Sequence, residues 1–143
     1  MNRNLINNKQ FFKELAKNEF QSDINFVLDN SKQELKFLSN KKVLFTGGCG
    51  FIGYYFYWTI INWNKKNKKK IDYTILDNIK KKPDWIDSSE IKFIRKDIST
   101  LDTSFFNSYD IIIHGASIAS PTHYRKEPIK TMKANILGLW KIL

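Results

Sequence analysis

The sequence predicts an α/β protein in which a doubly wound parallel sheet of about four strands follows a helical extension. From Lys41 onward, short runs rich in Ile, Val and Leu alternate with longer segments of helical periodicity. Such alternation is typical of a parallel sheet that helices cover on both faces. Before Lys41, apolar residues recur only at helical spacing. We therefore divide the chain into a helical extension, residues 1–40, and a sheet-containing domain, residues 41–143.

Two helical patterns are predicted in the extension. The first spans Lys9 to Glu19 and has three apolar side chains on one face: Phe12, Leu15 and Ala16. The second begins at Ser22 or Asp23, either of which can cap a helix. Its apolar residues repeat at helical spacing, at Ile24, Val27, Leu28, Leu35 and Leu38. We expect the extension either to pack on the domain or to form a contact between copies in a homo-oligomer.

The domain alternates between predicted strands and helices. The strands are the apolar runs Lys42–Thr46, Asp72–Asp77, Ile91–Asp97 and Asp110–Ser117. A helix is predicted over Phe51–Asn64, and another begins at Pro128, because proline is well tolerated in a first turn. The last helix has one apolar stripe, formed by Ile129, Met132, Ile136, Leu139, Trp140 and Leu143. The segment Asp102–Ser108 has no clear pattern.

Composition excludes several classes of protein. The single cysteine, Cys49, allows neither an internal disulfide nor a cysteine-based zinc site, and it fits a reducing compartment. We see no secretory signal, and the longest apolar run, Phe51–Ile61, is about half the length of a membrane-spanning helix. We expect a cytoplasmic protein with no membrane partner. Although the net charge is +10, we interpret the lysine clusters Lys65–Lys70 and Lys80–Lys82 as solvated connections, not a nucleic-acid site.

The stretch "VLFTGGCGFIGYYF", Val43–Phe56, has three glycines between a predicted strand and a predicted helix. That context is typical of the dinucleotide turn of a Rossmann-type sheet. We expect Gly47 to allow the tight turn, Gly50 to let the backbone approach a pyrophosphate, and Gly53 to let the helix pack against the sheet. The helix N-terminus would offer N–H groups to the phosphates. The alternative is a strand–helix bend that binds nothing.

The ends of the next two strands favour the dinucleotide interpretation. Asp77 ends the second strand, where a carboxylate can accept hydrogen bonds from the ribose hydroxyls of NAD and disfavours the extra phosphate of NADP. Lys80–Lys82 lie close enough in sequence to weaken that exclusion. Asp97 and Ile98 end the third strand, where they could flank an adenine ring. We therefore predict NAD as the cofactor.

Two motifs resemble those of the extended short-chain dehydrogenase/reductase family, whose members modify nucleotide sugars. "TGGCGFIG" is similar to the family's TGGxGFIG fingerprint. "HGASIASPTHYRKEPIKTMKANILGLWKIL", His114–Leu143, resembles a segment of UDP-glucuronate decarboxylases. The resemblance covers Lys41–Leu143. Members often have Leu at the position of Gly115 and Thr at that of Ala134, and we expect these departures to loosen the site.

The resemblance implies roles for individual residues. Gly50, Phe51 and Ile52 would contact the pyrophosphate, Asp77 and Asn78 the ribose, and Asp97 and Ile98 the adenine. Gly115, Ala116 and Ser117 would pass beneath the nicotinamide ribose. Lys133 would lie near the nucleotide sugar, a UDP-sugar in the full-length enzyme, and Asn135 would tie the last helix to the active-site backbone. We interpret His114 as a hydrogen-bonded core residue and Cys49 as a filler of the turn.

The family's catalytic pair is absent from these residues. Members oxidise C4 of the sugar with NAD, and a Tyr-x-x-x-Lys pair performs the proton chemistry. In the decarboxylases, the 4-keto sugar acid then loses carbon dioxide and is reduced again. None of the six tyrosines here has a lysine four residues later, so we assign no catalytic residue.

We expect the chain to form an incomplete Rossmann-type sheet, because in the order 3-2-1-4-5-6 a fifth strand normally pairs with the fourth. The fourth strand would then be an open edge, which can aggregate or recruit another chain. We interpret the chain as the N-terminal part of a nucleotide-sugar decarboxylase that has no turnover alone. The alternatives are part of a 4,6-dehydratase or 4-epimerase, and a non-catalytic NAD-binding or interaction module.

Overall fold

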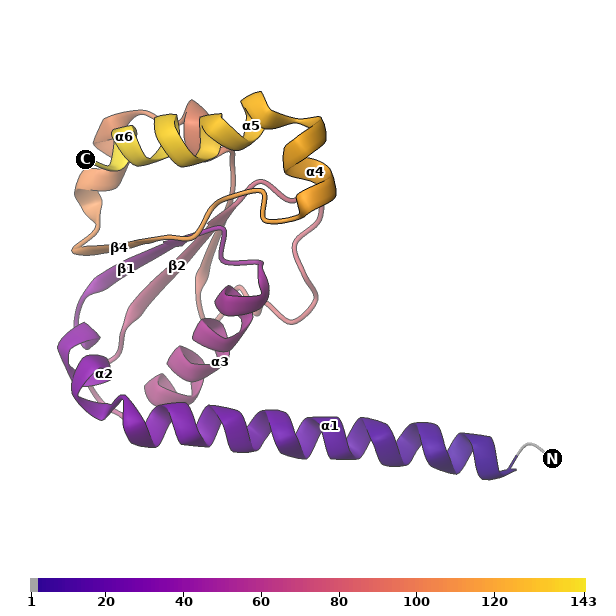
Figure 1. The fold of residues 1–143 in the computed structure, drawn as a ribbon. Helices are drawn as coiled ribbons and strands as arrows, with labels where there is room; N and C mark the ends of the chain where they lie inside the picture. The colour runs from indigo at the N-terminus through magenta and orange to yellow at the C-terminus, as the bar shows by residue number, and fades with distance from the viewer. Residues whose placement is uncertain (1–2) are drawn as a thin grey trace.

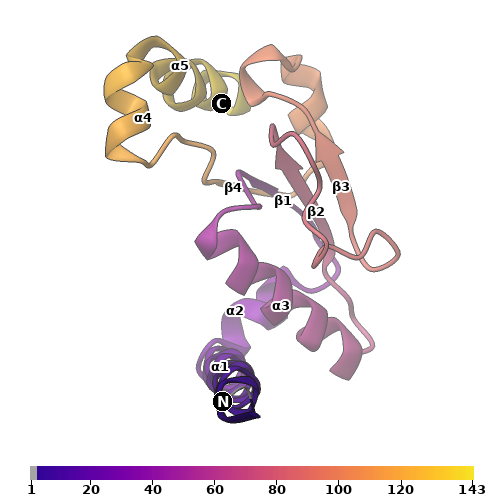
Figure 2. The ribbon, with the colours of Figure 1, turned by 90° about the vertical axis from the view of Figure 1, so that its right-hand side faces the viewer.

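The computed structural model describes residues 3–143, with side chains from residue 14 onward. Figure 1 shows a sheet with helix α3 (Phe51–Lys66) on one face and the C-terminal helical segments on the other. The N-terminal helix α1 (Arg3–Asn30) lies outside α3, and the view in Figure 2 shows the same stacking from the side. The predicted α/β class is thus confirmed.

The sheet has the predicted strand order. Its four strands are β1 (Lys42–Thr46), β2 (Asp72–Asp77), β3 (Lys92–Arg95) and β4 (Ile111–His114). They are all parallel and lie in the order β3-β2-β1-β4. The carboxyl end of β1 is central, since Thr46 pairs with Leu76 on one side and His114 on the other. Within the described chain, β4 pairs with β1 alone and forms an edge of the sheet.

Both faces of the sheet are covered, which explains its continuous apolar runs. On the α3 face, Val43, Phe45, Tyr73 and Ile75 belong to one buried cluster with side chains of α3. On the other face, Leu44 and Leu76 form a second cluster with residues of two short 3-10 segments. These segments are η1 (Ile98–Thr100) and η2 (Thr103–Ser108), and η2 falls in the segment that has no clear sequence pattern.

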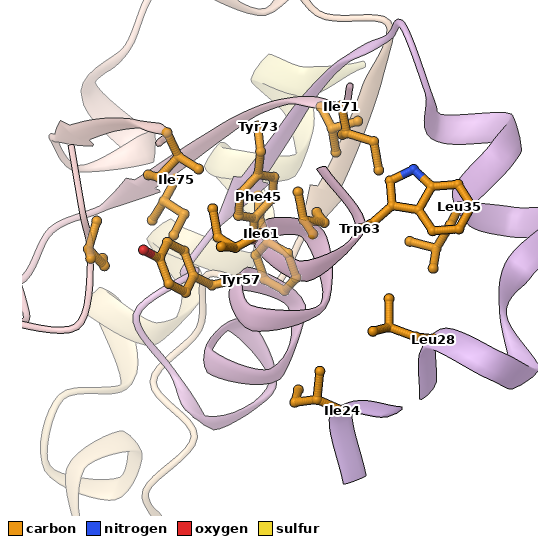
Figure 3. Packing of buried hydrophobic residues seen from close by; sticks show 14 residues of the cluster. Ile24, Leu28, Leu35, Phe45, Tyr57, Ile61, Trp63, Ile71, Tyr73 and Ile75 are labelled. Atoms are coloured by element: carbon orange, nitrogen blue, oxygen red, sulfur yellow. The ribbon is translucent and has the colours of Figure 1, made fainter. Parts of the chain in front are cut away.

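The extension packs on the domain through its second half. Ile24 and Leu28 on α1, and Leu35 on α2 (Lys32–Leu38), are buried in the cluster that includes α3 (Figure 3). Farther toward the N-terminus, Leu15 and Ala16 are exposed, and Phe12 lies outside the residues whose side chains are described. None of the helices in residues 3–143 is long and apolar enough to cross a bilayer.

The predicted helix boundary at Ser22 or Asp23 is wrong, because α1 runs without a break from Arg3 to Asn30. Asp23 does not cap a helix here. Its carboxylate accepts a hydrogen bond of 3.1 Å from the Tyr55 hydroxyl of α3. The break falls at Ser31, the residue that precedes α2. The polar residue expected to start a helix therefore anchors α1 to α3 instead.

The C-terminal part is helical but not uniform. It comprises α4 (Pro121–Lys126), α5 (Pro128–Met132), a π-helical turn η3 (Lys133–Leu137) and α6 (Gly138–Ile142). Gly138 is buried against Ile98, where an added Cβ would lie 2.9 Å from the Ile98 Cγ2 atom. The predicted apolar stripe faces away from this contact and is exposed, at Ile129, Met132, Ile136, Leu139, Trp140 and Leu143.

We expect Ile24→Ala to detach α1 and lower the free energy of unfolding, whereas Phe26→Ala should not. Ile24 has no exposed surface, and truncating a fully buried isoleucine costs about 2–5 kcal/mol. Phe26, two residues farther along α1, is 68% exposed, and its truncation should change stability by less than about 0.5 kcal/mol. Urea unfolding of both variants measures the difference. Equal stabilities would show that the extension does not contribute to the core.

Candidate functional site

The turn between β1 and α3 leaves no room for side chains at two of its glycines. Gly47 has a φ of +72°, and a Cβ there would lie 2.6 Å from the Ala116 Cα atom. At Gly53, a Cβ would lie 2.1 Å from the carbonyl oxygen of Gly48. The role predicted for Gly47, a tight turn, is confirmed. Gly53 permits close packing as predicted, but against the turn's own backbone.

Gly50 is different, because it has space beside it. An added Cβ would meet only the Gly47 carbonyl oxygen, at an ordinary 3.5 Å. Gly50 is the N-cap of α3, and the next two residues, Phe51 and Ile52, are 77% and 60% exposed. The first N–H groups of a helix lack intrahelical acceptors and carry partial positive charge. The start of α3 therefore presents an anion-binding surface that is open to solvent.

Asp77 connects this turn to the end of β2. Its Oδ2 atom accepts a hydrogen bond of 2.9 Å from the Cys49 N–H, and its Oδ1 atom accepts one of 3.2 Å from the Ile79 N–H. The Gly47 N–H donates to the neighbouring Leu76 carbonyl at 2.7 Å. The Asp77 carboxylate thus holds the glycine turn in place. The same carboxylate lies at the position predicted to bind a ribose.

Cys49 lies beside this carboxylate, and its thiol is unreactive at neutral pH. Burial and, to a lesser degree, the Asp77 charge raise the pKa of the Cys49 thiol to about 12. Since the thiolate is the reactive form of cysteine, the thiol is protonated at neutral pH and is a poor nucleophile. This protonation state agrees with the interpretation of Cys49 as a filler of the turn.

One cleft of about 790 Å³ lies at the carboxyl ends of the strands. Its volume falls within the range typical of small-molecule and cofactor sites. Every residue assigned to cofactor or substrate binding from the sequence lines it: Gly47, Gly50, Phe51, Ile52, Gly53, Asp77, Asn78, Asp97, Ile98, Gly115, Ala116, Ser117 and Lys133. The structure brings these residues together, and their individual roles stay predictions.

At the end of β3, the predicted adenine side of the cleft is built by a short turn. Asp97 caps η1, and its Oδ1 atom accepts hydrogen bonds from the Ser99 N–H at 2.9 Å and the Ser99 hydroxyl at 2.8 Å. Ile98 is 4% exposed and packs under the C-terminal helix. The turn therefore holds the backbone of this wall in a fixed position.

Two lysines that follow Asp77 in the sequence make contacts within their own loop. Lys81 pairs with Asp84 at 3.2 Å, and Lys82 donates to the Ile86 carbonyl. Lys96 lines the cleft instead, next to Asp97. Two of the three sequence neighbours considered as a route to NADP binding, Lys81 and Lys82, thus make contacts within their own loop.

At the end of β4, three side-chain and backbone groups meet. The Thr46 hydroxyl lies 2.8 Å from His114 Nδ1, and the Ala116 N–H donates to the same hydroxyl at 3.4 Å. The Gly115 N–H donates to the Thr46 carbonyl at 2.9 Å. Burial lowers the pKa of His114, and a nearby backbone group of Ala134 opposes this in part. His114 is therefore a neutral, hydrogen-bonded residue of the cleft wall.

The departure at Gly115 does not loosen the site as expected. A Cβ at this position would lie 2.9 Å from the Phe45 ring. The aromatic ring therefore already fills the space that a side chain would need. This part of the prediction is wrong, because Phe45 compensates for the missing side chain.

The far wall of the cleft is formed by α5 and η3. Lys133 and Lys130 both line it, and Lys130 is paired with Glu127 at 2.8 Å. Asn135 is exposed and lines a separate shallow hollow beside Ile136. The expectation that Asn135 contacts the site backbone is therefore wrong for the described residues.

Sequence reasoning missed several lining residues, among them Thr46, Lys96 and Lys130. Lys130 could have been found, because it lies three residues before Lys133 and so shares its helix face. Thr46 could also have been found, since it ends the strand directly before the glycine turn. Lys96 carries no such signal, because its place in the cleft depends on how the loop after β3 folds.

Comparisons with known proteins agree with this geometry. The model of the NAD dependent epimerase/dehydratase family matches residues 43–143. UDP-glucuronic acid decarboxylase 6 of Arabidopsis thaliana is 35% identical over 111 residues, which cover 75% of this chain and 30% of that protein. UDP-glucuronic acid decarboxylase 1 of Danio rerio is 32% identical over 117 residues, which cover 76% of this chain and 26% of that protein.

Solved structures show the same fold. An epimerase of Methanothermobacter thermautotrophicus matches with a TM-score of 0.57 at 26% identity, covering 77% of this chain and 32% of that one. The UDP-glucose 4-epimerase of Thermus thermophilus, solved with NAD, matches with a TM-score of 0.54 at 23% identity, covering 71% and 32%. The chain spans less than a third of the length of each of these four proteins.

The lowered pKa of His114 predicts a loss of stability in mild acid. A folded-state pKa below the ordinary value of 6.5 means that the unfolded chain binds more protons. The stability that neutral His114 contributes is therefore present above pH 6.5 and is lost as the pH falls through and below that value. Urea unfolding at several pH values should show a steeper decline for the wild type than for His114→Gln. Parallel declines would assign the acid sensitivity to other groups.

Proposed function

The chain belongs to the NAD-dependent epimerase/dehydratase family, and we propose that it is the NAD-binding portion of a nucleotide-sugar-modifying enzyme. One observation carries the proposal. The glycine turn, the start of α3 and Asp77 line a single cleft, together with the ends of β3 and β4. An anion-binding helix start beside a carboxylate is the arrangement that a dinucleotide requires, with the pyrophosphate on the first and a ribose on the second.

The residues present fit NAD. Gly50 leaves space at the start of α3, so a pyrophosphate can approach the backbone of Phe51 and Ile52. Asp77 keeps lone pairs on both carboxylate oxygens beyond the single backbone N–H that each accepts, and these can take ribose hydroxyls. Its charge would repel the additional phosphate of NADP. When bound, NAD supplies hydride transfer to and from a sugar carbon.

Among the reactions of the family, UDP-glucuronate decarboxylation is the one we propose for the enzyme to which this portion corresponds. Five relatives that are 32–35% identical to this chain are UDP-glucuronic acid decarboxylases. The motif "SIASPTHY", Ser117–Tyr124, supports the same choice over a 4,6-dehydratase or a 4-epimerase. Lys133, exposed on the far wall of the cleft, would meet the nucleotide sugar.

A second candidate is a non-catalytic NAD-binding module. The observation that favours it is the lack of any Tyr-x-x-x-Lys pair in these residues. Both candidates require NAD binding, and they differ in whether chemistry follows. The β4 edge and the exposed apolar stripe of α5 to α6 are where a further strand and helix, or another chain, would pack.

We expect Gly50→Trp to abolish NAD binding without unfolding the chain. The indole would fill the space in front of the α3 N-terminus, whereas the backbone has room for the Cβ itself. Isothermal titration calorimetry with NAD measures the affinity. Phe26→Trp, which adds the same side chain at an exposed site on α1, is the matched control and should bind NAD as the wild type does. Unchanged affinity in Gly50→Trp would remove the glycine turn from the proposed site.

We expect the 143-residue chain to bind NAD but not to turn over a nucleotide sugar. Without a Tyr-x-x-x-Lys pair, no side chain of these residues takes the proton from the sugar hydroxyl during hydride transfer. Incubation with UDP-glucuronate and NAD, followed by absorbance of NADH and by chromatography of the nucleotide sugars, tests this. Decarboxylated product above the protein-free blank would show that another base serves.

A further inference from the structure

A partly buried imidazole, that of His114, lies between the glycine turn and the helix on the far wall of the cleft. Thr46, the last residue of β1, has no exposed surface and immediately precedes Gly47. Its hydroxyl lies 2.8 Å from His114 Nδ1, across the register pair at the ends of β1 and β4. The carboxyl end of β1 is thus joined to the glycine turn along the chain, and to the His114 ring by a hydrogen bond across the sheet.

The hydrogen bonds around Thr46 assign the tautomer of this ring. The Ala116 N–H can only donate to the Thr46 hydroxyl, so among the hydrogen-bond partners of this hydroxyl in the described residues, His114 Nδ1 is the one that can accept its proton. A neutral imidazole whose Nδ1 accepts a hydrogen bond carries its proton on Nε2. The network therefore makes Nε2 a donor.

This donor is buried and has no acceptor at bonding geometry. Within the described part of the chain, His114 Nε2 makes no hydrogen bond. Leaving a buried donor unpaired is unfavourable, and such groups are rare in folded proteins. With Nδ1 engaged by Thr46, the backbone of Ala134 is the polar group near the rest of the ring. Ala134 follows Lys133 directly in the π-helical turn η3.

The His114 ring therefore lies between two walls of the cleft, and a ligand in the cleft would contact both walls. One wall contains the glycine turn, in which the backbone of Gly47 contacts that of Ala116 in the loop that follows β4. The other wall is η3, which places Lys133 on the cleft. A shift of η3 that brings the Ala134 carbonyl to bonding geometry would give the Nε2–H an acceptor. The π-helical turn suits such movement, since its hydrogen bonds deviate from the α-helical pattern.

We propose that His114 is a positioning residue that couples the glycine turn to the helix of Lys133, by donating its Nε2–H to the Ala134 carbonyl when a ligand closes the cleft. The coupling rests on the proposed function, because NAD is the ligand that engages the glycine turn. In this coupling, Thr46 and His114 act together. Thr46 sets the tautomer, and His114 transmits the closure to the wall that meets the nucleotide sugar.

Two pairs of substitutions test the coupling. The side-chain amide of His114→Gln can reach the Nε2 position, whereas the shorter His114→Asn reaches only the Nδ1 position. Thr46→Ser keeps the hydroxyl, and Thr46→Val removes it. The measurements are the dissociation constant for NAD and the amide hydrogen exchange of residues 47–53 and 133–142, with and without saturating NAD. Urea unfolding first confirms that each variant folds.

In the wild type, NAD should slow exchange in both segments. In His114→Asn and Thr46→Val, we expect NAD to protect residues 47–53 as before but no longer to protect residues 133–142. The affinity for NAD should be weaker by about threefold to tenfold, because that is the contribution of one neutral hydrogen bond. His114→Gln and Thr46→Ser should restore the wild-type response. A purely structural role would not separate the two segments in this way.

Two results would overturn the coupling. One is NAD-dependent protection of residues 133–142 that is unchanged in His114→Asn. The other is a nitrogen NMR spectrum of the ligand-free chain that shows the His114 proton on Nδ1. A wild-type chain that binds no NAD would instead overturn the proposed function, and the NMR spectrum would still decide the tautomer on which the coupling depends.

Discussion

The close backbone contact inside the glycine turn is the constraint on which the rest of the structure depends. Gly53 brings the first turn of α3 onto the Gly48 carbonyl, and Gly47 brings the strand end onto Ala116. No side chain fits at either place, so the start of α3 can reach the plane of the strand ends only with glycine there. Asp77 then fixes the turn through the Cys49 N–H. The shape of the cleft is a consequence of these contacts.

Much of the fold could be predicted from the sequence, because its signals are strong and local. The bounds of β1 and β2 agree with their apolar runs, and the strand order is that of the Rossmann-type sheet that the glycine turn indicates. The cleft residues could be predicted as a set for a topological reason. In a parallel sheet the carboxyl ends of all strands lie on one edge, so Gly47, Asp77, Asp97 and Gly115 have to meet there.

The parts that could not be predicted depend on contacts between distant residues. Asp23 has the chemistry of a helix cap, and its bond to the Tyr55 hydroxyl becomes visible only when α1 is placed on α3. The outward direction of Asn135 depends on the π-helical turn, whose wider winding shifts the faces of the last helix. Likewise, the bond between Thr46 and His114 joins residues 68 positions apart, and periodicity does not report such pairs.

The contact between Gly47 and Ala116 has a consequence for the order in which the protein folds. The β1–α3 unit carries the whole glycine fingerprint, yet one side of its turn is completed only when β4 arrives from about 70 residues later in the chain. Contacts of such sequence separation form late, because closing a long loop costs entropy before the contact is made. The cleft is therefore absent from any partly folded chain that has not yet paired β4 with β1. A ligand of this cleft selects the fully paired sheet and draws the folding equilibrium toward it by mass action.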